Sequence, residues 1–361
     1  MNILILTDGE FYNGGYSTIA LKIYNNIKNI YNTDLFTLVF LKKKKFNDNE
    51  IFIHTINFNN EDIINKIMKD FFHTNIRYSI IITTSPLSYY AASIYFNKSK
   101  IIYFKGGGLK GDIFIENLKD KNILNENIDL YLDQITQQLE NNGAINNDNY
   151  TVIPTTKIME IILSRSKILK FNKENIIPPY NFYFFEQNKL HNNIKKIYDI
   201  IFVVSDHNRI VKNSKFVFEI FNKFPNLNKV VIGKNCEFYS NVKNTTIING
   251  NISLEETFNY FSLSKILLVP SYFDTGPSTI IESIIYGCIP ICYYNCGFSM
   301  FDIGCISLNN LILEEWCKFI DTNIKNINIE DLIIKSNNLN LLIEQDNIMF
   351  NKFIAQELLK K

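Results

Sequence analysis

The stretch that decides the fold is ILLVPSYFDTGPSTIIESIIYGCIPICYY, residues 266–294. Its two ends, 266–270 and 289–294, are short apolar runs without charge, as expected of buried strands. Residues 278–286 have the pattern of a helix, and the loop SYFDTGP joins the first strand to it. Strand, helix and strand in this order predict two parallel strands connected by a right-handed crossover.

The same alternation of apolar and amphipathic runs continues along the chain, in two sets. The first set predicts strands at 2–6, 34–41, 78–83, 100–104, 128–135, 151–155 and 175–179, with helices at 17–30 and 159–170. The second set predicts strands at 198–205, 228–233 and 245–250, with helices at 215–224 and 253–264, before the stretch quoted above. We therefore expect an α/β protein with two Rossmann-like, doubly wound parallel-sheet domains that face each other across a cleft.

The length of 361 residues also favours two domains. The polar stretch NFYFFEQNKLHNNIKK (181–196) separates the two sets, so we place the first domain at 1–185 and the second at 186–344. The amphipathic run 345–361 is expected to be a C-terminal helix that packs back onto the first domain. Ser253 and Glu256 have the spacing of a capping box at the start of the helix over 253–264.

Composition and charge exclude several classes of protein. Hydrophobic residues make up 46% of the chain and charged residues 20%, which is typical of a globular protein with a core. The net charge of +1 does not indicate a nucleic-acid-binding surface. No apolar run reaches the roughly 18–20 residues of a membrane span, and the N-terminal run has no basic leader or cleavage site. We expect a cytoplasmic protein.

Two features suggest other sites, which we weigh against simpler explanations. Cys288, Cys292 and Cys296 recur every four residues, but Pro290 and Gly297 interrupt any helix that would align them. Buried thiols are therefore expected rather than a metal site. The run LKKKKFND (41–48) favours a solvated loop, although peripheral contact with an anionic membrane stays open.

Ligands of doubly wound sheets bind at the carboxyl ends of the strands, so the loops there are the candidate site. Residues 7–18 contain Gly14 and Gly15 just before a helix, where the backbone can approach a ligand closely. Residues 105–112, KGGGLKGD, begin with Lys105, and their glycines are able to form an anion-binding nest or a plain turn. In 205–213, Arg209 and Lys212 are two cations able to neutralise a diphosphate.

The loop over 271–279 is the fourth candidate. Gly276, Pro277, Ser278 and Thr279 open the helix, with Pro277 expected at its first position. The first N–H groups of a helix favour anions. Asp274 before this turn and Glu282 about one turn into the helix are carboxylates able to accept hydrogen bonds from hydroxyl groups of a sugar.

These residues carry a resemblance to a known family. PSYFDTGPSTIIESIIYGCIPICYYNCG (270–297) resembles the donor-binding segment of retaining glycosyltransferases of the GT-B fold, family 4 (group 1). That family has two acids separated by seven residues, as Asp274 and Glu282 are. Its segment begins with Pro-Ser and ends with Gly-x-Pro, as Pro270-Ser271 and 287–290 do here. KVVIGKN (229–235) and NIIPPYN (175–181) resemble two further motifs of the family.

The resemblance implies a metal-independent, hexosyltransferase-type enzyme. It would move a sugar, with retention, from a UDP- or GDP-sugar to a hydroxyl of a glycan, lipid-linked or protein acceptor, without a cofactor. The 1–185 domain would be the acceptor side and 186–344 would bind the nucleotide sugar. The family's roles would fall on the catalytic residues Asp274, Lys212 and Arg209 and on the donor-binding residues Glu282, Gly276, Pro277, Ser278, Thr279, Gly14, Gly15, Lys105, Gly233, Asn251 and Ile252.

Within that set, Glu282 would accept hydrogen bonds from the ribose, and Gly276 to Thr279 would cradle the diphosphate. Asp274 would contact hydroxyls of the transferred sugar, and Lys212 would neutralise the leaving diphosphate. The base would lie against Gly233 and Lys234 and against residues 249–252.

The sequence departs from the family at three places. The first acid is Asp274 where the family usually has Glu, the usual Gly-Arg pair is Ser205-Asp206, and Lys105 stands where many members have a histidine that contacts the sugar. These departures leave two alternatives open. One is a nucleotide-sugar epimerase of the same fold, and the other is a non-catalytic protein that binds nucleotide sugars or acts as a scaffold. A phosphorylase is disfavoured because the chain has no signature for its phosphate or cofactor lysine.

Overall fold

The structure is a computed structural model that describes residues 2–8, 15–39, 51–55, 78–85, 88, 89, 92, 96, 99–105, 150–156, 160, 185, 187, 188, 190 and 195–359. These residues belong to two compact units. Phe185–Ile343 belongs to one of them, and the first sheet together with the chain from Glu344 onward belongs to the other.

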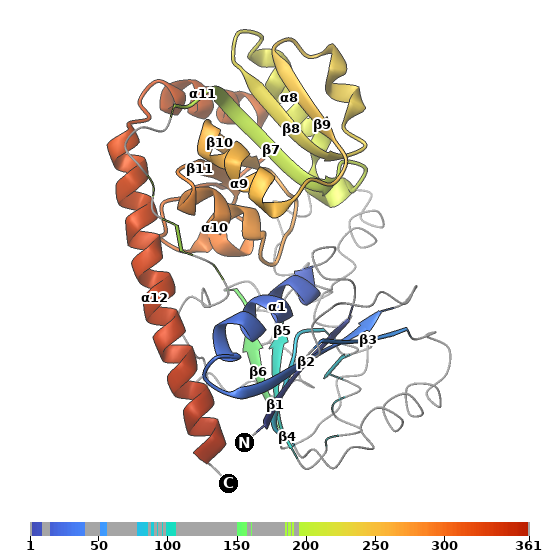
Figure 1. Ribbon diagram of the computed structural model, residues 1–361. Coiled ribbons are helices and arrows are strands. Elements are labelled where there is room, and N and C mark those ends of the chain that lie inside the picture. The colour runs from blue at the N-terminus through green and yellow to red at the C-terminus, as the bar shows by residue number, and fades with distance from the viewer. Residues whose placement is uncertain are drawn as a thin grey trace. The chain divides into compact units, whose positions relative to one another are not determined.

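The first unit is built on a six-stranded parallel sheet (Figure 1). Its strands are β1 (Asn2–Asp8), β2 (Asn32–Val39), β3 (Ile51–Thr55), β4 (Tyr78–Thr83), β5 (Lys100–Lys105) and β6 (Tyr150–Pro154). They lie in the order β3-β2-β1-β4-β5-β6, which is the order of a doubly wound nucleotide-binding sheet. The helix α1 (Gly15–Ile27) connects β1 to β2, and the apolar side chains of β1 and β4 are buried.

The second unit repeats this topology. Its sheet has the order β12-β11-β10-β7-β8-β9, again with all strands parallel. The strands are β7 (Tyr198–Asp206), β8 (Lys229–Lys234), β9 (Thr245–Asn249), β10 (Ser264–Val269), β11 (Ile289–Tyr293) and β12 (Ile306–Leu308). The helices are α8 (Ser214–Lys223), α9 (Leu254–Leu263), α10 (Ser278–Ile285), α11 (Leu313–Ile324) and the first part of α12 (Ile329–Leu359), with short 3-10 helices η2 (Ile210–Lys212), η3 (Glu237–Asn241) and η4 (Gly297–Met300).

The core of the second unit lies between the sheet and the helices α8 and α11. Apolar residues of alternate strand positions, such as Phe202 and Val231, face Val217, Phe221 and Trp316, and all five are buried. The rings of Phe216 and Trp316 meet edge to face at 5.4 Å, so the two helices pack directly on each other. At this density of packing the strand ends are held in place, and the loops that follow them are anchored.

The expected strands and helices of the second set are all present, including the Ser253–Glu256 capping box, in which Glu256 N–H donates to Ser253 Oγ at 3.1 Å. In the first set, the strands at 2–6, 34–41, 78–83, 100–104 and 151–155 and the helix at 17–30 are confirmed with small changes of boundary. The expected elements at 128–135 and 175–179, and all of 159–170 except Glu160, lie outside the described residues.

Four features were not expected from the sequence. The strands β3 and β12 and the helix α11 were not predicted, and the last helix begins at Ile329 rather than at residue 345. The first part of α12 packs on the second unit, where Ser336 Oγ donates to Ile285 O at 2.8 Å. Its last part packs on the first unit, where Asn26 Nδ2 donates to Asn347 Oδ1 at 3.3 Å and Tyr31 Oη donates to Asn351 O at 3.2 Å.

Among the helices that the structure describes, none is long and apolar enough to cross a membrane. The six cysteines are all free thiols. Cys288, Cys292 and Cys296 are buried, as the sequence predicted, and burial raises the pKa of each. Within the described ranges, no three His, Cys, Asp or Glu side chains are placed to hold a metal ion.

Candidate active site

The candidate site lies at the carboxyl edge of the second sheet, where β7 and β10 are neighbours. After β7 the chain moves to β8 on one side, and after β10 it moves to β11 on the other side. The loops after these two strands therefore lie at the topological switch point of the sheet, which is where doubly wound sheets bind ligands. Arg209 and Lys212 follow β7, and 270–277 follow β10.

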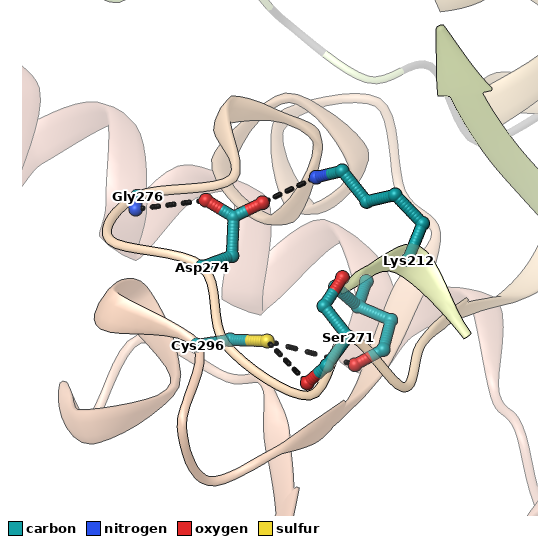
Figure 2. Close-up of polar contacts among 6 residues, drawn as sticks. Lys212, Ser271, Asp274, Gly276 and Cys296 are labelled. Atoms are coloured by element: carbon teal, nitrogen blue, oxygen red, sulfur yellow. Dashed lines mark hydrogen bonds and ion pairs between the residues drawn. The ribbon is translucent and has the colours of Figure 1, made fainter. Parts of the chain in front are cut away.

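The centre of the site is the carboxylate of Asp274 (Figure 2). Its Oδ2 forms an ion pair with the ammonium of Lys212, and its Oδ1 accepts a hydrogen bond from Gly276 N–H at 3.1 Å. The two charged side chains are only 15% and 19% exposed, so water screens them less than it screens a surface pair. A single cation is thus held at the turn that leads into α10.

The loop after β7 is tied to the loop after β10 through its backbone. Asn213 has left-handed backbone angles (φ 56°, ψ 41°), and its Nδ2 donates to Pro270 O at 3.2 Å. Tyr272 N–H donates to Val211 O at 2.9 Å. Lys212, between Val211 and Asn213, therefore has its backbone fixed on both sides, and its side chain reaches Asp274 from an anchored position.

A third loop, after β11, supports the same turn from below. Asp274 N–H donates to Asn295 O at 3.2 Å, and Gly297 N–H donates to Asp274 O at 2.8 Å. Asn295 is fully buried and its Nδ2 donates to Tyr272 O at 3.2 Å, while its Oδ1 has no hydrogen-bond partner in the described part of the chain. The thiol of Cys296 lies 3.7 Å from Val269 O and 3.9 Å from Ser271 O (Figure 2).

The amino end of α10 adjoins this turn. The helix begins at Ser278 and Pro277 is its N-cap, so proline stands one position earlier than the sequence analysis placed it. Because proline has no side-chain acceptor, it does not cap the first N–H groups of the helix. Ser278 and Thr279 are half-buried at this end, where their backbone N–H groups and hydroxyls favour an anion.

Glu282 lies in the next turn of α10 and is 6% exposed. The apolar residues around it, Ile280, Ile281, Ile284 and Ile285, are also buried. A carboxylate is expensive to bury without polar partners, and Glu282 makes polar or electrostatic contacts within the chain. It is the fifth residue of α10, one turn in from the amino end.

His207 is a residue of the site that the sequence analysis missed. It is buried directly after β7, with Nε2 3.2 Å from Ile232 O and Nδ1 3.2 Å from Ser214 Oγ. A carbonyl oxygen only accepts, so Nε2 carries the proton and Nδ1 accepts from the Ser214 hydroxyl. Burial lowers the pKa of His207 to about 4, and the imidazole is neutral near pH 7. The only available signal was its place in the loop after a predicted strand.

Gly233 is the last but one residue of β8 and lies beside this histidine. Its φ is +141°, and a Cβ built on it would lie 1.9 Å from Val204 O. Only glycine fits there, because β8 lies beside β7 in the sheet and the Val204 carbonyl occupies the place of a side chain. Gly250 N–H donates to Gly233 O at 3.1 Å, which brings the turn with Asn251 and Ile252 to the same edge. The structure therefore brings together Gly233 and residues 250–252, which the sequence analysis predicted to contact the nucleotide base.

Asp206, the residue in place of the family's Gly-Arg pair, has a structural role. Its Oδ1 accepts hydrogen bonds from Asn235 Nδ2 at 2.8 Å and from Asn208 N–H at 2.9 Å. Both bonds lower the pKa of Asp206, and the bond from Asn235 has the larger effect. The carboxylate thereby joins the loop after β7 to the loop after β8.

The remaining predicted residues are not brought into this constellation. Arg209 is exposed and precedes η2. Gly15 begins α1 and Lys105 ends β5 in the first unit, where only their backbones are described. Gly14 lies outside the described residues.

Comparison with solved structures gives extensive matches. Sucrose-phosphate synthase from Thermosynechococcus elongatus matches with a TM-score of 0.71 and 13% identity, over 100% of both chains. HepE from Anabaena in complex with UDP-glucose matches with a TM-score of 0.66 and 11% identity, over 99% of this chain and 100% of that one. The chain has the GT-B fold.

A third match with the GT-B fold is trehalose-6-phosphate synthase, in a study of glycosyl transfer with retention. It has a TM-score of 0.61 and 13% identity, and 98% of each chain is covered. No family model and no curated protein sequence matches the chain. At these identities the likeness to solved structures establishes the fold, and the activity has to be argued from the site.

Proposed function

We propose that this GT-B protein transfers a sugar from a nucleoside-diphosphate sugar to an acceptor hydroxyl, with retention of configuration and without a metal ion. One observation carries the proposal. A single ammonium group, Lys212, is held by Asp274 next to an amino end of α10 that its proline N-cap leaves uncapped. A cation beside free helix N–H groups is suited to a diphosphate.

In this proposal the donor diphosphate lies between Lys212 and residues 276–279. When the sugar leaves, negative charge develops on the β-phosphate, and the ammonium and the helix end stabilise it. Arg209, exposed just before η2, is the second cation that we assign to that group. The protein's own positive groups thus take the part that a metal ion plays in other phosphate chemistry.

The two carboxylates take the hydroxyl groups of the donor. Glu282, in the second turn of α10, accepts from the ribose, and Asp274 accepts from the transferred sugar once Lys212 turns toward the phosphate. The base lies against Gly233, Asn251 and Ile252 at the ends of β8 and β9. Gly14, Gly15 and Lys105 of the first unit stay predicted donor-binding residues, and the first unit is the proposed acceptor side.

The solved structures support this choice of donor. HepE was solved with UDP-glucose and with UDP, and trehalose-6-phosphate synthase was studied for transfer with retention. HepE shares the fold over nearly the whole chain, so we favour a UDP-sugar over a GDP-sugar. The proposed acceptor is a glycan, a lipid-linked sugar or a protein. Peripheral contact with a membrane is expected only for a lipid-linked acceptor.

The test is calorimetric titration of UDP and GDP into the full chain, followed by incubation of the preferred UDP- or GDP-sugars with an acceptor panel. We expect UDP to bind without added metal and in the presence of EDTA. Lys212→Ala is expected to weaken binding at least tenfold, since a charge-assisted hydrogen bond contributes roughly 1.5–3 kcal/mol. Lys215→Ala, an exposed lysine on the neighbouring helix α8, is the matched control. Equal affinity of both variants would reject the phosphate role of Lys212.

NMR of the product separates the proposal from its alternatives. A transferred sugar with the donor's anomeric configuration supports a retaining transferase, and an inverted one contradicts retention. Conversion of the donor to its epimer would indicate the epimerase. UDP binding with no turnover on any acceptor would favour the non-catalytic binding protein, for which the Lys212–Asp274 pair would be the resting arrangement.

A further inference from the structure

The outward face of α12 carries a straight row of exposed apolar side chains. Ile334, Leu341 and Ile348 are 56%, 57% and 50% exposed, while the opposite face of the helix, with Leu339 and Ile343, is buried. The three are spaced by seven residues, which is nearly two turns, so they lie close to one line along the helix. Single exposed apolar residues are ordinary, but three in line, one in each seven residues, give an apolar strip on which a second helix is able to pack.

The row is complementary to itself in the antiparallel direction. If a second copy of α12 crosses with Leu341 opposite its own counterpart, Ile334 of each copy falls opposite Ile348 of the other. Asn338 then falls opposite Glu344, and Asn337 opposite Gln345, so every polar neighbour of the row has a hydrogen-bonding partner.

The charges of this face agree with the same alignment. Glu330 of each copy falls opposite Lys352 of the other, which forms two opposite-charge pairs at the ends of the overlap, and both residues are exposed. A parallel pairing would instead set Glu330, Glu344 and Lys352 each against its own counterpart. Charge therefore selects the antiparallel arrangement.

We propose that this face of α12 is the surface on which two copies of the chain associate, antiparallel about a two-fold axis at Leu341. Such a contact is isologous and closes at two copies. The surface that a single helix pair buries is smaller than the roughly 1,200 Å² buried in a standard interface. The proposed dimer is therefore weak and forms at micromolar concentration. An anionic membrane fits the face poorly, because Glu330, Asp331 and Glu344 outnumber Lys352 on it.

Sedimentation velocity of the full chain, from nanomolar to high micromolar concentration, tests the proposal. We expect a monomer–dimer equilibrium that Leu341→Glu weakens at least tenfold, because it sets two carboxylates side by side on the axis. The control is Leu359→Glu on the same helix. Leu359 is 79% exposed, but its counterpart in the antiparallel overlap would lie before the start of α12, so the dimer should be unchanged. A monomer at every concentration, or a dimer that Leu341→Glu leaves equally tight, overturns the proposal.

Charge reversal and crosslinking test the register. Glu330→Lys or Lys352→Glu alone should weaken the dimer, and the double variant should restore it. Under air oxidation with a copper catalyst, Leu341→Cys should give a disulfide between positions 341 of two copies, with the wild-type chain as the control for native thiols. Ile334→Cys alone should not crosslink to itself, and a 334–334 disulfide would contradict the antiparallel arrangement. Leu341-dependent binding of phosphatidylserine vesicles by a chain that stays monomeric would assign the face to a membrane instead.

Discussion

Lys212 and Asp274 form an ion pair that joins the loop after β7 to the loop after β10. The two residues are 62 positions apart in the sequence, and both come from loops fixed by backbone hydrogen bonds. In the proposed reaction the Lys212 ammonium has to exchange this carboxylate for the donor diphosphate. The pair therefore opposes donor binding by the free energy that it contributes.

Asp274→Asn should separate binding from catalysis. Without the carboxylate, Lys212 is available to phosphate at once, so we expect UDP to bind at least as tightly as in the wild type. Transfer should fall at least tenfold, because a charge-assisted hydrogen bond to the sugar, roughly 1.5–3 kcal/mol, is lost. Calorimetry with UDP and initial rates with the UDP-sugar measure the two effects. Weaker UDP binding together with unchanged transfer would contradict this assignment.

The ribose role of Glu282 is testable with a modified nucleotide. We expect UDP to bind the wild type more tightly than 2′,3′-dideoxy-UDP by roughly 1.5–3 kcal/mol, since only UDP offers hydroxyl groups to the carboxylate. In Glu282→Gln, which keeps the size of this buried side chain, most of that difference should vanish. If the variant discriminates the two nucleotides as well as the wild type does, Glu282 does not bind the ribose.

His207 should make the second unit less stable in mild acid. Its pKa is about 4 in the folded chain and close to 6.5 when unfolded, so the unfolded state binds the extra proton between these values. Neutral His207 therefore contributes fully to the free energy of unfolding above about pH 6.5, and this contribution is lost as the pH falls toward about 4. The loss is at most roughly 3 kcal/mol. Urea unfolding across this range should show a shallower pH dependence for His207→Gln. An identical pH dependence in both proteins would mean that another group is responsible.

Gly233 and Gly250 form a matched pair for testing the contact between the ends of β7 and β8. Both have positive φ, +141° and +114°, so alanine strains the backbone at either position. At Gly233 the added Cβ also meets Val204 O at 1.9 Å, while at Gly250 nothing lies within 4 Å among the described residues. We expect Gly250→Ala to cost about 1–3 kcal/mol of unfolding free energy and Gly233→Ala to cost more. Equal losses in urea unfolding would show that the strand ends move apart at little cost.

The local pattern of apolar residues in the sequence predicted much of the fold. Short apolar runs such as 198–205 and 266–270 are strands because they are buried on both faces of a parallel sheet. The short strand β12 has half-buried residues at the edge of the sheet, and so its pattern is weak. The last helix extends back to Ile329 because its first part packs on the second unit, and that contact is not visible in the amphipathic run near the C-terminus.

The candidate site divides in the same way. The sequence by itself determined the turn from Asp274 to Glu282, since residues within one loop and one helix are placed by their spacing. Only the tertiary structure decided that Lys212 reaches Asp274, that His207 is buried against Ile232, and that Gly233 has to be glycine. These relationships depend on strand order and on the closeness of loops far apart in the chain, and non-local contacts of this kind follow from packing rather than from local pattern.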